Sequence, residues 1–445
     1  MPAGILDSEF YKDGWSTEEM RAVFDDRRRY QRWLDIEAAL ARVQATLGII
    51  PGPAAEEISA KARLENIDLE FVRSELRRTR HSLVPLLRGL QRACEGGHGE
   101  YIHFGPTTQD IEDTGAVLEL REAWQIILRD LRKVEERLMG LARRHRDTLM
   151  CGRTHGQQAL PITLGLKLAI WVSETRRAVE RFKELAPRLF VGMLHGGAGT
   201  MAGLGPRAME VLEGLMGELG LGVPDVGWGN SRDRFAEFVS VTALTAASLG
   251  KMANEIFCLS RSEIGEMAEG LPEGYVGSST MPHKRNPEVS EMVVMLSRVI
   301  RSHVPASLES VDCVNERDTR SWRIDWWALP ECSMMLGAML SMTLDMLEGL
   351  EIHEDRMLAN LDMLQGLLLS EGLMFELGRK IGKQTAHQVI GRACMRVHEE
   401  KRPIADVLMG QISDYGLHVG QSGPMVDRVL ATSQRLRALD PEQVR

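Results

Sequence analysis

The chain has 445 residues and a net charge of -9, with 44% hydrophobic and 26% charged residues, which is ordinary for a soluble globular protein. This charge argues against a nucleic-acid-binding surface, and no apolar run reaches the roughly 20 residues of a membrane span. The N-terminal stretch has neither the basic region nor the apolar run of a secretory signal, so none is expected. The six cysteines are scattered without a CxxC pair, so we expect reduced thiols, no metal site and a cytoplasmic location.

The first predicted helix begins at "STEEM", where Ser16 and Glu19 have the spacing of a capping box. Apolar side chains then recur every three or four residues from Trp33 to Leu47, which marks one face of a helix. Gly48 and Pro51 are expected to end it.

Longer segments with few helix-breaking residues follow. They cover residues 110–147, 163–190, 233–269, 288–311 and 328–350. These lengths exceed the average globular helix of roughly 12 residues, and strand signals are nearly absent. The pattern predicts an all-α fold with a long central helical bundle, and the 24 methionines suit long helix–helix contacts.

Candidate domain boundaries lie near the glycine-rich "EGGHGE" at 95–100 and near 351–356. We therefore expect an N-terminal helical domain over 1–106, a central long-helix bundle over 107–350 and a C-terminal helical domain over 351–445. No internal repeat or low-complexity tract interrupts them.

A first polar cluster, "HFGPTTQDIEDT", covers His103 to Thr114. Thr107, Thr108 and Asp110 lie where a long helix is predicted to begin, so hydroxyl groups and free backbone amides would point outward together. That arrangement suits a carboxylate ligand. Ordinary N-capping is the alternative interpretation.

A second cluster, "CGRTHGQQALP", covers Cys151 to Pro161. His155 follows Thr154 in a predicted turn, where its ring could face a cleft. A lone histidine is more often structural, but the neighbouring Arg153, Thr154 and Gln157 favour a functional site.

A third cluster, "HGGAGTMAGLG", covers His195 to Gly205. Gly197, Gly199 and Ala202 have the spacing of a dinucleotide fingerprint, but a clear strand before them and a well-spaced acid after them are missing. We expect a tight backbone approach to a substrate or a neighbouring helix instead of a dinucleotide site.

A fourth cluster, "GSSTMPHKRNP", covers Gly277 to Pro287. Ser278 and Ser279 follow the glycine, and Lys284 and Asn286 precede a proline that suits the first turn of a helix. The cation, the amide and the positive end of the new helix would form an anion cradle beside a serine. The absence of a GxSxG elbow gives hydrolase chemistry little support.

Taken in chain order, these segments resemble the fumarase/aspartase superfamily. The similarity is greatest to its branch of adenylosuccinate lyases and 3-carboxy-cis,cis-muconate lactonizing enzymes, or cycloisomerases. "GSSTMPHKRNP" matches the superfamily signature almost residue for residue, "HFGPTTQDIEDT" resembles "HxGxTSxDxxDT", and "GRTHGQQALP" resembles "GRTHGQxAxP". "RDRFAEF" at 232–238 and "NERD" at 315–318 match further segments, so the resemblance covers nearly the whole chain.

The resemblance implies a three-domain all-α fold, a homotetramer with active sites shared between subunits, and anti β-elimination of fumarate without a cofactor. By matching position, Ser278 would be the general base and His155 the general acid, and Glu291 would orient His155 across a subunit boundary. With the neighbours of His155 included, the candidate substrate-binding residues are His81, His103, Thr107, Thr108, Thr154, Gln157, Lys284, Asn286 and Arg317.

This chemistry needs a fixed positive environment. Removing a proton beside a carboxylate builds a dianionic aci-carboxylate, which cations, amides and helix ends stabilise as it forms. A serine is a poor base in water, so Ser278 would need an oxyanion environment from Lys284 and nearby amides. The glycines and prolines would let this loop close over the substrate.

His155 favours a lyase within this branch, because bacterial lactonizing enzymes commonly have a tryptophan there. The segments "HSLVPLL" and "WALPE" instead lean toward the lactonizing enzymes. We therefore expect a lyase that releases fumarate, or a close relative, from an N-substituted aspartate. A muconate-type cycloisomerase is the main alternative, and a non-catalytic scaffold is a third.

The leaving group is expected to differ from that of adenylosuccinate. An ungapped match from Asn286 through Arg317 puts Trp322 and Trp326 where adenylosuccinate lyases have a serine and an arginine that hold the nucleotide phosphate. An indole has one donor and no charge, so it cannot replace a guanidinium. An Arg-Tyr pair that contacts the phosphate is also missing near the start. We expect a smaller, apolar or aromatic leaving group, with Arg320 and Arg323 as the residues that could restore the charge.

Overall fold

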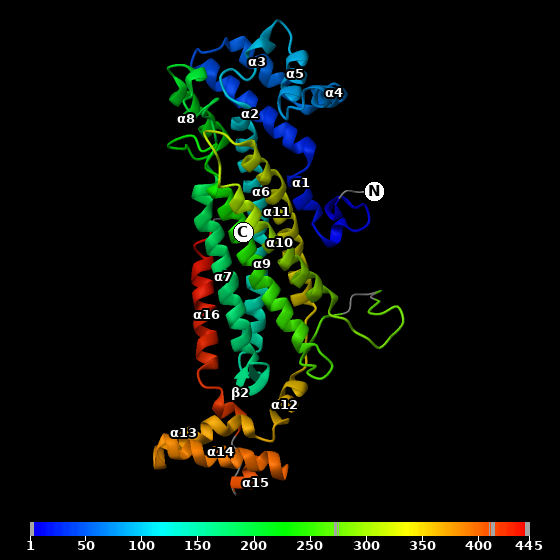
Figure 1. Cartoon of the computed structure of the whole chain (residues 1–445), viewed down its shortest axis with the longest axis vertical. Helices are drawn as coiled ribbons and strands as arrows, with labels where there is room; N and C mark the ends of the chain where they lie inside the picture. Colours follow the sequence, from blue (N-terminus) through cyan, green and yellow to red (C-terminus); the bar gives the residue numbers. More distant parts are fainter. Residues whose placement is uncertain (1–3, 271–273, 275, 409, 411–413, 441–445) are drawn as a thin grey trace. The chain divides into compact units, whose positions relative to one another are not determined.

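The computed structural model describes residues 4–270, 274, 276–408, 410 and 414–440 (Figure 1). It is 69% helical, and its strands form two antiparallel two-stranded sheets. The all-α prediction is therefore confirmed, with two short sheets that the sequence did not reveal. No helix in the described part of the chain is long and apolar enough to cross a membrane.

The chain divides into two compact units. Unit 1 comprises residues 1–128, 179–247 and 296–339, and unit 2 comprises 129–178, 248–295 and 340–445. Both contain parts of the long helices, which are α6 (Thr108–Arg144), α7 (Leu164–Leu189), α9 (Asp233–Leu259), α10 (Glu288–Glu309) and α11 (Thr319–Glu348). Because the units interleave along the chain, they do not correspond one to one with the three expected domains, which remain a prediction.

Unit 1 contains the shorter helices of the first half of the chain. These are α1 (Glu18–Val23), α2 (Asp26–Thr46), α3 (Gly52–Lys61), α4 (Leu69–Thr79), α5 (Val84–Ala93) and α8 (Ala208–Leu219). Helices α3 and α8 pack on α2, and α5 packs on α3 and α4 (Figure 1). Their core is built around Trp33, Ile36, Ile58 and Leu86 and extends to Ile111 of α6. This packing fixes the start of α6 against α2.

Unit 2 contains both sheets and the C-terminal helices. Strands β1 (Leu149–Thr154) and β2 (Gln157–Thr163) form one hairpin, and β3 (Met267–Ala268) pairs with β4 (Glu351–Ile352). The helices are α12 (Glu354–Asp362), α13 (Ser370–Ile381), α14 (Lys383–Glu400), α15 (Ile404–Leu408) and α16 (Ser422–Arg437). A small core of Ala393, Val397, Ile404 and Val407 joins α14 to α15.

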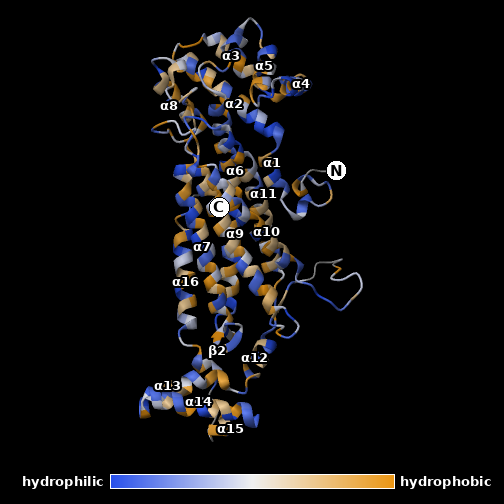
Figure 2. Ribbon diagram, viewed as in Figure 1, coloured by the Kyte–Doolittle hydropathy of each residue, from blue (hydrophilic) through white to orange (hydrophobic). Residues whose placement is uncertain are grey.

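The long helices agree with the predicted segments except at two ends. Helix α9 stops at Leu259 instead of 269, because the chain turns back and the amide of Glu266 donates to the Leu259 carbonyl. Helix α11 begins at Thr319 instead of 328, because the Asp318 carboxylate accepts from the amide of Arg320 and caps the helix. Figure 2 shows apolar and polar residues interleaved along these helices.

The predicted first helix is in fact two helices, and its predicted cap is wrong. Thr17, not Ser16, caps α1 by accepting from the Met20 amide at 3.2 Å. The Ser16 hydroxyl instead donates to the Lys12 carbonyl. Asp25 then caps α2, because its carboxylate accepts from the amides of Arg27 and Arg28, the second and third residues of the helix.

Candidate active site

The start of α6 brings two of the polar clusters and the "NERD" segment together in unit 1. The buried Asp110 carboxylate accepts from the backbone amides of Thr107 at 2.8 Å, His195 at 2.9 Å and Gly196 at 3.0 Å. Arg317 donates from Nη2 to Thr107 Oγ1 and to the Gly197 carbonyl, both at 2.9 Å. The first cluster, the third cluster and the "NERD" segment therefore meet around the Thr107 hydroxyl.

Of the two interpretations of this helix end, ordinary N-capping is confirmed in part, and carboxylate binding stays a prediction. The Asp110 carboxylate caps the start of α6 by accepting from the Thr107 amide, which is ordinary N-capping. The Thr108 hydroxyl, in contrast, has no hydrogen-bond partner within the described residues. Thr108 and the Arg317 guanidinium that contacts Thr107 can therefore bind a carboxylate at this end.

The glycine-rich third cluster makes the close backbone approach that was expected, although its partner is a loop and not a helix. A Cβ atom on Gly105, whose φ is +103°, would lie 2.9 Å from the Gly203 carbonyl oxygen. Only glycine permits this contact between the loops that precede α6 and α8. The approach joins two loops of unit 1, and no βαβ unit surrounds it among the described residues.

His103 is held by an acid that the sequence analysis missed. Its Nδ1 lies 2.7 Å from Glu37 Oε1, and its backbone amide donates to Glu37 Oε2 at 3.1 Å. Burial lowers the pKa of His103, but the Glu37 carboxylate outweighs burial and raises the pKa above its ordinary value. Glu37 interrupts the apolar face between Trp33 and Leu40, and an acid in that position was the available signal.

His81 has the opposite character. Its Nδ1 accepts from the Val84 amide at 3.3 Å, which leaves the proton of the neutral ring on Nε2. Burial lowers the pKa of His81, and the cations at Arg323 and His103 lower it further. The two histidines thus differ, because the neutral form is favoured at His81 whereas His103 retains its proton to higher pH.

In unit 2, His155 occupies the tip of the β1–β2 hairpin. Thr154 pairs with Gln157, so the turn consists of His155 and Gly156, with φ values of +53° and +75°. Two positive φ values define a type I′ turn, which a histidine adopts only with strain. The side chains of Thr154, His155 and Gln157 are exposed, and that of His155 has no hydrogen-bond partner among the described residues.

The neighbouring Arg153 has a structural role. Its guanidinium donates to both oxygens of the buried Glu266, at 2.9 and 2.7 Å, and Asn360 donates to the same carboxylate. This network anchors the end of β1 next to the turn that carries His155.

Two backbone amides of the Gly277–Pro287 loop donate to the Ser278 hydroxyl. Ser278 Oγ accepts hydrogen bonds from the backbone amides of Met281 at 3.0 Å and Thr280 at 3.3 Å. The Asn286 side chain donates to the Gly277 carbonyl at 2.6 Å and closes the loop on itself. Lys284 is exposed, and its ammonium group has no acidic partner among the described residues. An alkoxide on Ser278 would therefore be stabilised by two amide dipoles.

One part of the predicted anion cradle is wrong. The amides of Val289 and Ser290, in the first turn of α10, donate to the Glu269 carboxylate at 3.1 and 2.6 Å. The positive end of this helix is occupied by a protein acid and does not face a ligand. Glu291, the expected partner of His155, is exposed, and its carboxylate has no partner in the described chain.

The candidate residues are thus divided between the units. Unit 1 holds His81, His103, Thr107, Thr108, Arg317, Arg320, Trp322, Arg323 and Trp326. Unit 2 holds Thr154, His155, Gln157, Ser278, Lys284, Asn286 and Glu291. Across the described residues, no group of three or more His, Cys, Asp or Glu side chains could hold a metal ion.

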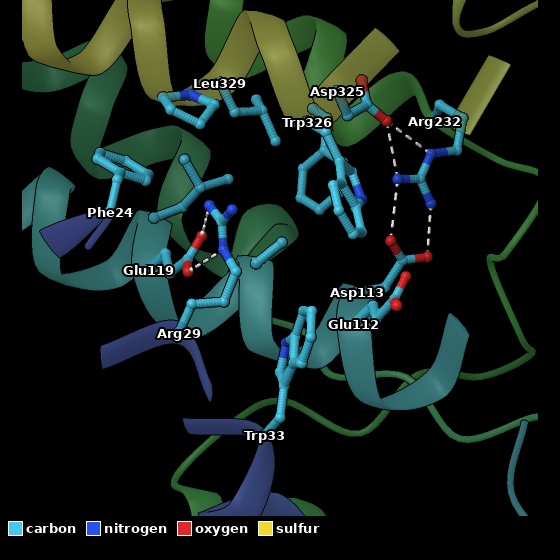
Figure 3. Close-up of a pocket in the computed structure, with 14 residues that line it drawn as sticks. Phe24, Arg29, Trp33, Glu112, Asp113, Glu119, Arg232, Asp325, Trp326 and Leu329 are labelled. Atoms are coloured by element: carbon cyan, nitrogen blue, oxygen red, sulfur yellow. Dashed lines mark hydrogen bonds and ion pairs between the residues drawn. The ribbon is translucent and has the colours of Figure 1, made fainter. Parts of the chain in front are cut away.

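The two tryptophans of α11 have different environments. Trp322 is 5% exposed, and its indole N–H donates to Asp113 at 3.1 Å. Asp113 also pairs with the buried Arg232, which binds Asp325, so this network ties α6, α9 and α11 together (Figure 3). Trp326 is partly exposed and lines a cleft of about 590 Å³.

The cleft lies between α2, α4 and α11 within unit 1. Its apolar wall includes Trp326, Trp33 and Tyr30, and Ser82 supplies a hydroxyl. Gly115 of α6 makes room for Trp33, because a Cβ atom there would lie 2.6 Å from Trp33 Nε1. The volume suits a small organic group.

Glu112 is a buried acid beside the same aromatic residues (Figure 3). It is 3% exposed, and neither of its carboxylate oxygens makes a close hydrogen bond to another described residue. Burial raises the pKa of Glu112 to about 7, against the opposing effects of the Ser82 hydroxyl and the Arg323 guanidinium. The carboxyl therefore changes charge near neutral pH.

Replacing Glu112 with glutamine should remove a pH dependence of stability. Because the pKa of Glu112 rises from about 4.5 to about 7 on folding, its contribution to stability is complete below pH 4.5 and is lost as the pH rises to about 7. The loss should reach about 3 kcal/mol. Thermal midpoints at pH 5 and pH 8, at one protein concentration, measure it. The exposed Glu56→Gln is the control, and an equal pH dependence in Glu112→Gln and wild type would contradict the assignment.

Comparison with known proteins shows that the chain belongs to the lyases. A family model described as "Lyase" matches residues 14–302, so the chain belongs to this family, within the fumarase/aspartase superfamily that the motifs predicted. It is 42% identical to N-acetyl-S-(2-succino)cysteine lyase of Enterococcus italicus, over 98% of each chain. It is 40% identical to adenylosuccinate lyase of Methanothermobacter thermautotrophicus, over 95% of this chain and 98% of the relative.

A solved structure shares the fold. The 3-carboxy-cis,cis-muconate lactonizing enzyme from Pseudomonas putida superimposes with a TM-score of 0.90 and 34% identity, over 97% of this chain and 100% of that chain. Both predicted branches are therefore represented among the relatives, and the prediction of an enzyme of this superfamily is confirmed.

Proposed function

We propose that the protein releases fumarate by anti β-elimination from a succinate that is substituted at C2 through sulfur or nitrogen. A cysteine-type thiol is the first candidate for the leaving group, because relatives at 42% and 43% identity are named N-acetyl-S-(2-succino)cysteine lyase. The observation that carries the elimination is the pair of backbone amides that donate to Ser278 Oγ.

The groups on the chain support each step. Ser278, as alkoxide, takes a proton from the carbon beside one substrate carboxylate, and the two amides stabilise the alkoxide beforehand. Thr107, Thr108, Lys284 and Arg317 bind the succinyl carboxylates while the extra negative charge develops. The bond to the leaving atom then breaks, the C=C bond of fumarate forms, and His155 donates a proton to the departing sulfur or nitrogen.

We further propose that the active enzyme is a cytoplasmic homotetramer with sites shared between subunits. The side chains of His155 and Glu291 have no partners among the described residues of one chain. This supports the proposal that a neighbouring subunit supplies those partners. The six cysteines are free thiols, in keeping with a reducing compartment. The expected partner is a small dicarboxylate, and no nucleic acid or membrane is involved.

A substrate panel tests the function. N-acetyl-S-(2-succino)cysteine, simple N-substituted aspartates, adenylosuccinate and 3-carboxy-cis,cis-muconate would be compared by steady-state kinetics, with fumarate or muconate measured directly. We expect fumarate from the substituted succinates. Loss of muconate without fumarate release from any substrate would establish the cycloisomerase, and complete inactivity would favour the scaffold.

Adenylosuccinate should be a poor substrate, with kcat/KM below about 10⁴ M⁻¹s⁻¹, the low end for natural substrates. The indole N–H of Trp322 is already used by Asp113, and Trp326 carries no charge. Losing two charge-assisted contacts to a phosphate, at roughly 1.5–3 kcal/mol each, weakens binding by orders of magnitude. Efficient cleavage of adenylosuccinate would contradict this role of the tryptophans.

A further inference from the structure

Two arginines near the start of α11 differ in what they bind. Arg320 is exposed, and its guanidinium donates to both oxygens of Asp318 at 2.9 and 2.6 Å. Arg323 lies on the indole faces instead, with its Cζ 3.9 Å from the Trp326 ring centroid and 4.7 Å from that of Trp322. It donates from Nη2 to Ser82 Oγ at 3.2 Å, and no acid among the described residues forms an ion pair with it.

This arrangement leaves the guanidinium able to bind an anion in its own plane. The guanidinium lies over both indole rings, which are nearly perpendicular to each other, and the N–H donors that Ser82 does not use are available to a ligand. Arginine has five such donors, and Ser82 receives one of them here. A cation held on two rings without a counter-ion is preorganised for a ligand carboxylate.

The position of Arg323 connects the cleft with the residues assigned to the substrate. Ser82 and Trp326, which hold Arg323, both line the 590 Å³ cleft. His81 precedes Ser82, and its pKa is lowered by the charges of both Arg323 and His103. The charge of Arg323 also acts on Glu112, where it opposes the rise in pKa that burial causes. Glu112 lies one helical turn beyond Thr108 on the same face of α6. A group that extends from the succinyl carboxylates into the cleft would pass Arg323.

We propose that Arg323 binds a carboxylate carried by the leaving group and thereby selects the substrate. This inference rests on the proposed function and adds the chemical class of the leaving group, a small thiol or amine that bears one carboxylate. A single guanidinium close to the buried Glu112 suits a monoanion better than a phosphate dianion. Of the arginines that line the cleft, Arg29 pairs with Glu119 and Arg73 with Glu70, whereas Arg27 has no ion-pair partner among the described residues.

The test compares two substrates that differ in this carboxylate alone. N-acetyl-S-(2-succino)cysteine carries it, and N-acetyl-S-(2-succino)cysteamine has the same skeleton without it. We expect the wild type to prefer the first by about 10–100-fold in kcat/KM, the value of one charge-assisted contact. In Arg323→Gln the preference should fall to near unity, with the rate on the cysteamine substrate largely retained. Arg323→Lys should give an intermediate preference, because it keeps the charge without the planar fork.

Arg92→Gln is the matched control. Arg92 also stacks on an aromatic ring, with its Cζ 4.0 Å from the Phe71 centroid, but its side chain is exposed on another helix. Its substrate preference should equal that of the wild type. Because the readout is a ratio within each variant, partial loss of folded enzyme does not affect it.

The outcomes separate the two proposals. A preference that survives in Arg323→Gln, or an equal fall on both substrates, overturns the role of Arg323 and leaves the proposed function standing. If the wild type releases fumarate from neither thioether, the proposed function fails for sulfur leaving groups, and the inference for this substrate class fails with it.

Discussion

Replacing Ser278 with alanine should lower turnover at saturating substrate by about 10²–10⁴-fold, the usual contribution of a positioned acid or base. Substrate binding should be largely retained, because the groups proposed to bind the carboxylates, at Thr107, Arg317 and Lys284, remain. Turnover should fall because Ser278 Oγ is the atom to which the amides of Thr280 and Met281 donate. An alanine there offers no oxygen to carry the alkoxide.

Ser279→Ala is the matched control for this variant. Ser279 is exposed in the same loop, and its hydroxyl has no hydrogen-bond partner among the described residues. Its removal should leave most of the activity. Turnover that is unchanged in Ser278→Ala would remove Ser278 from the mechanism, and an equal loss in both variants would show that the loop tolerates no substitution.

Local sequence patterns were sufficient to predict the long helices and most of the polar segments between them. Helix α6 and helix α7 begin within two residues of the predicted segments, because glycines, prolines and polar runs interrupt the helical periodicity there. The Gly277–Pro287 loop was also identifiable, because a polar cationic run does not belong to a packed helix.

Features that depend on distant partners could not be predicted in this way. Glu269 caps α10 from the other side of the loop, and nothing within α10 itself indicates that acid. The hairpin that carries His155 is stabilised through Arg153 and the buried Glu266, more than a hundred residues apart in the chain. Such contacts follow from tertiary packing and not from local propensity.

The two arginines of α11 illustrate the same limit within one helix. Arg320 and Arg323 are three residues apart, so periodicity places them on nearly the same face. Arg320 forms an ion pair with Asp318, whereas Arg323 makes cation–π contacts with the indoles of Trp322 and Trp326. The sequence therefore indicated that a charge could be restored near the tryptophans, and the structure was needed to choose Arg323.

The division of the site suggests a strong test of subunit sharing. His155, Glu291 and Lys284 are all exposed and have no side-chain partners within the described part of one chain. If the acid and the base of one site come from different subunits, an inactive His155→Ala enzyme and an inactive Ser278→Ala enzyme should complement each other. Random exchange in equal amounts would leave about a quarter of the sites with both groups intact.

A second mixture gives the control that this experiment needs. Wild type mixed equally with the His155→Ala/Ser278→Ala double variant should keep about a quarter of its sites intact if the two groups come from different subunits, and about half if they share one. Each single variant, taken alone through the same exchange procedure, should remain inactive. Because the two mixtures contain the same number of each side chain, the comparison isolates where the groups reside. Subunit exchange is verified by mass. If the first mixture then shows no recovery and the second keeps half of its activity, His155 and Ser278 of each site lie in a single chain. A monomer by light scattering would exclude shared sites altogether.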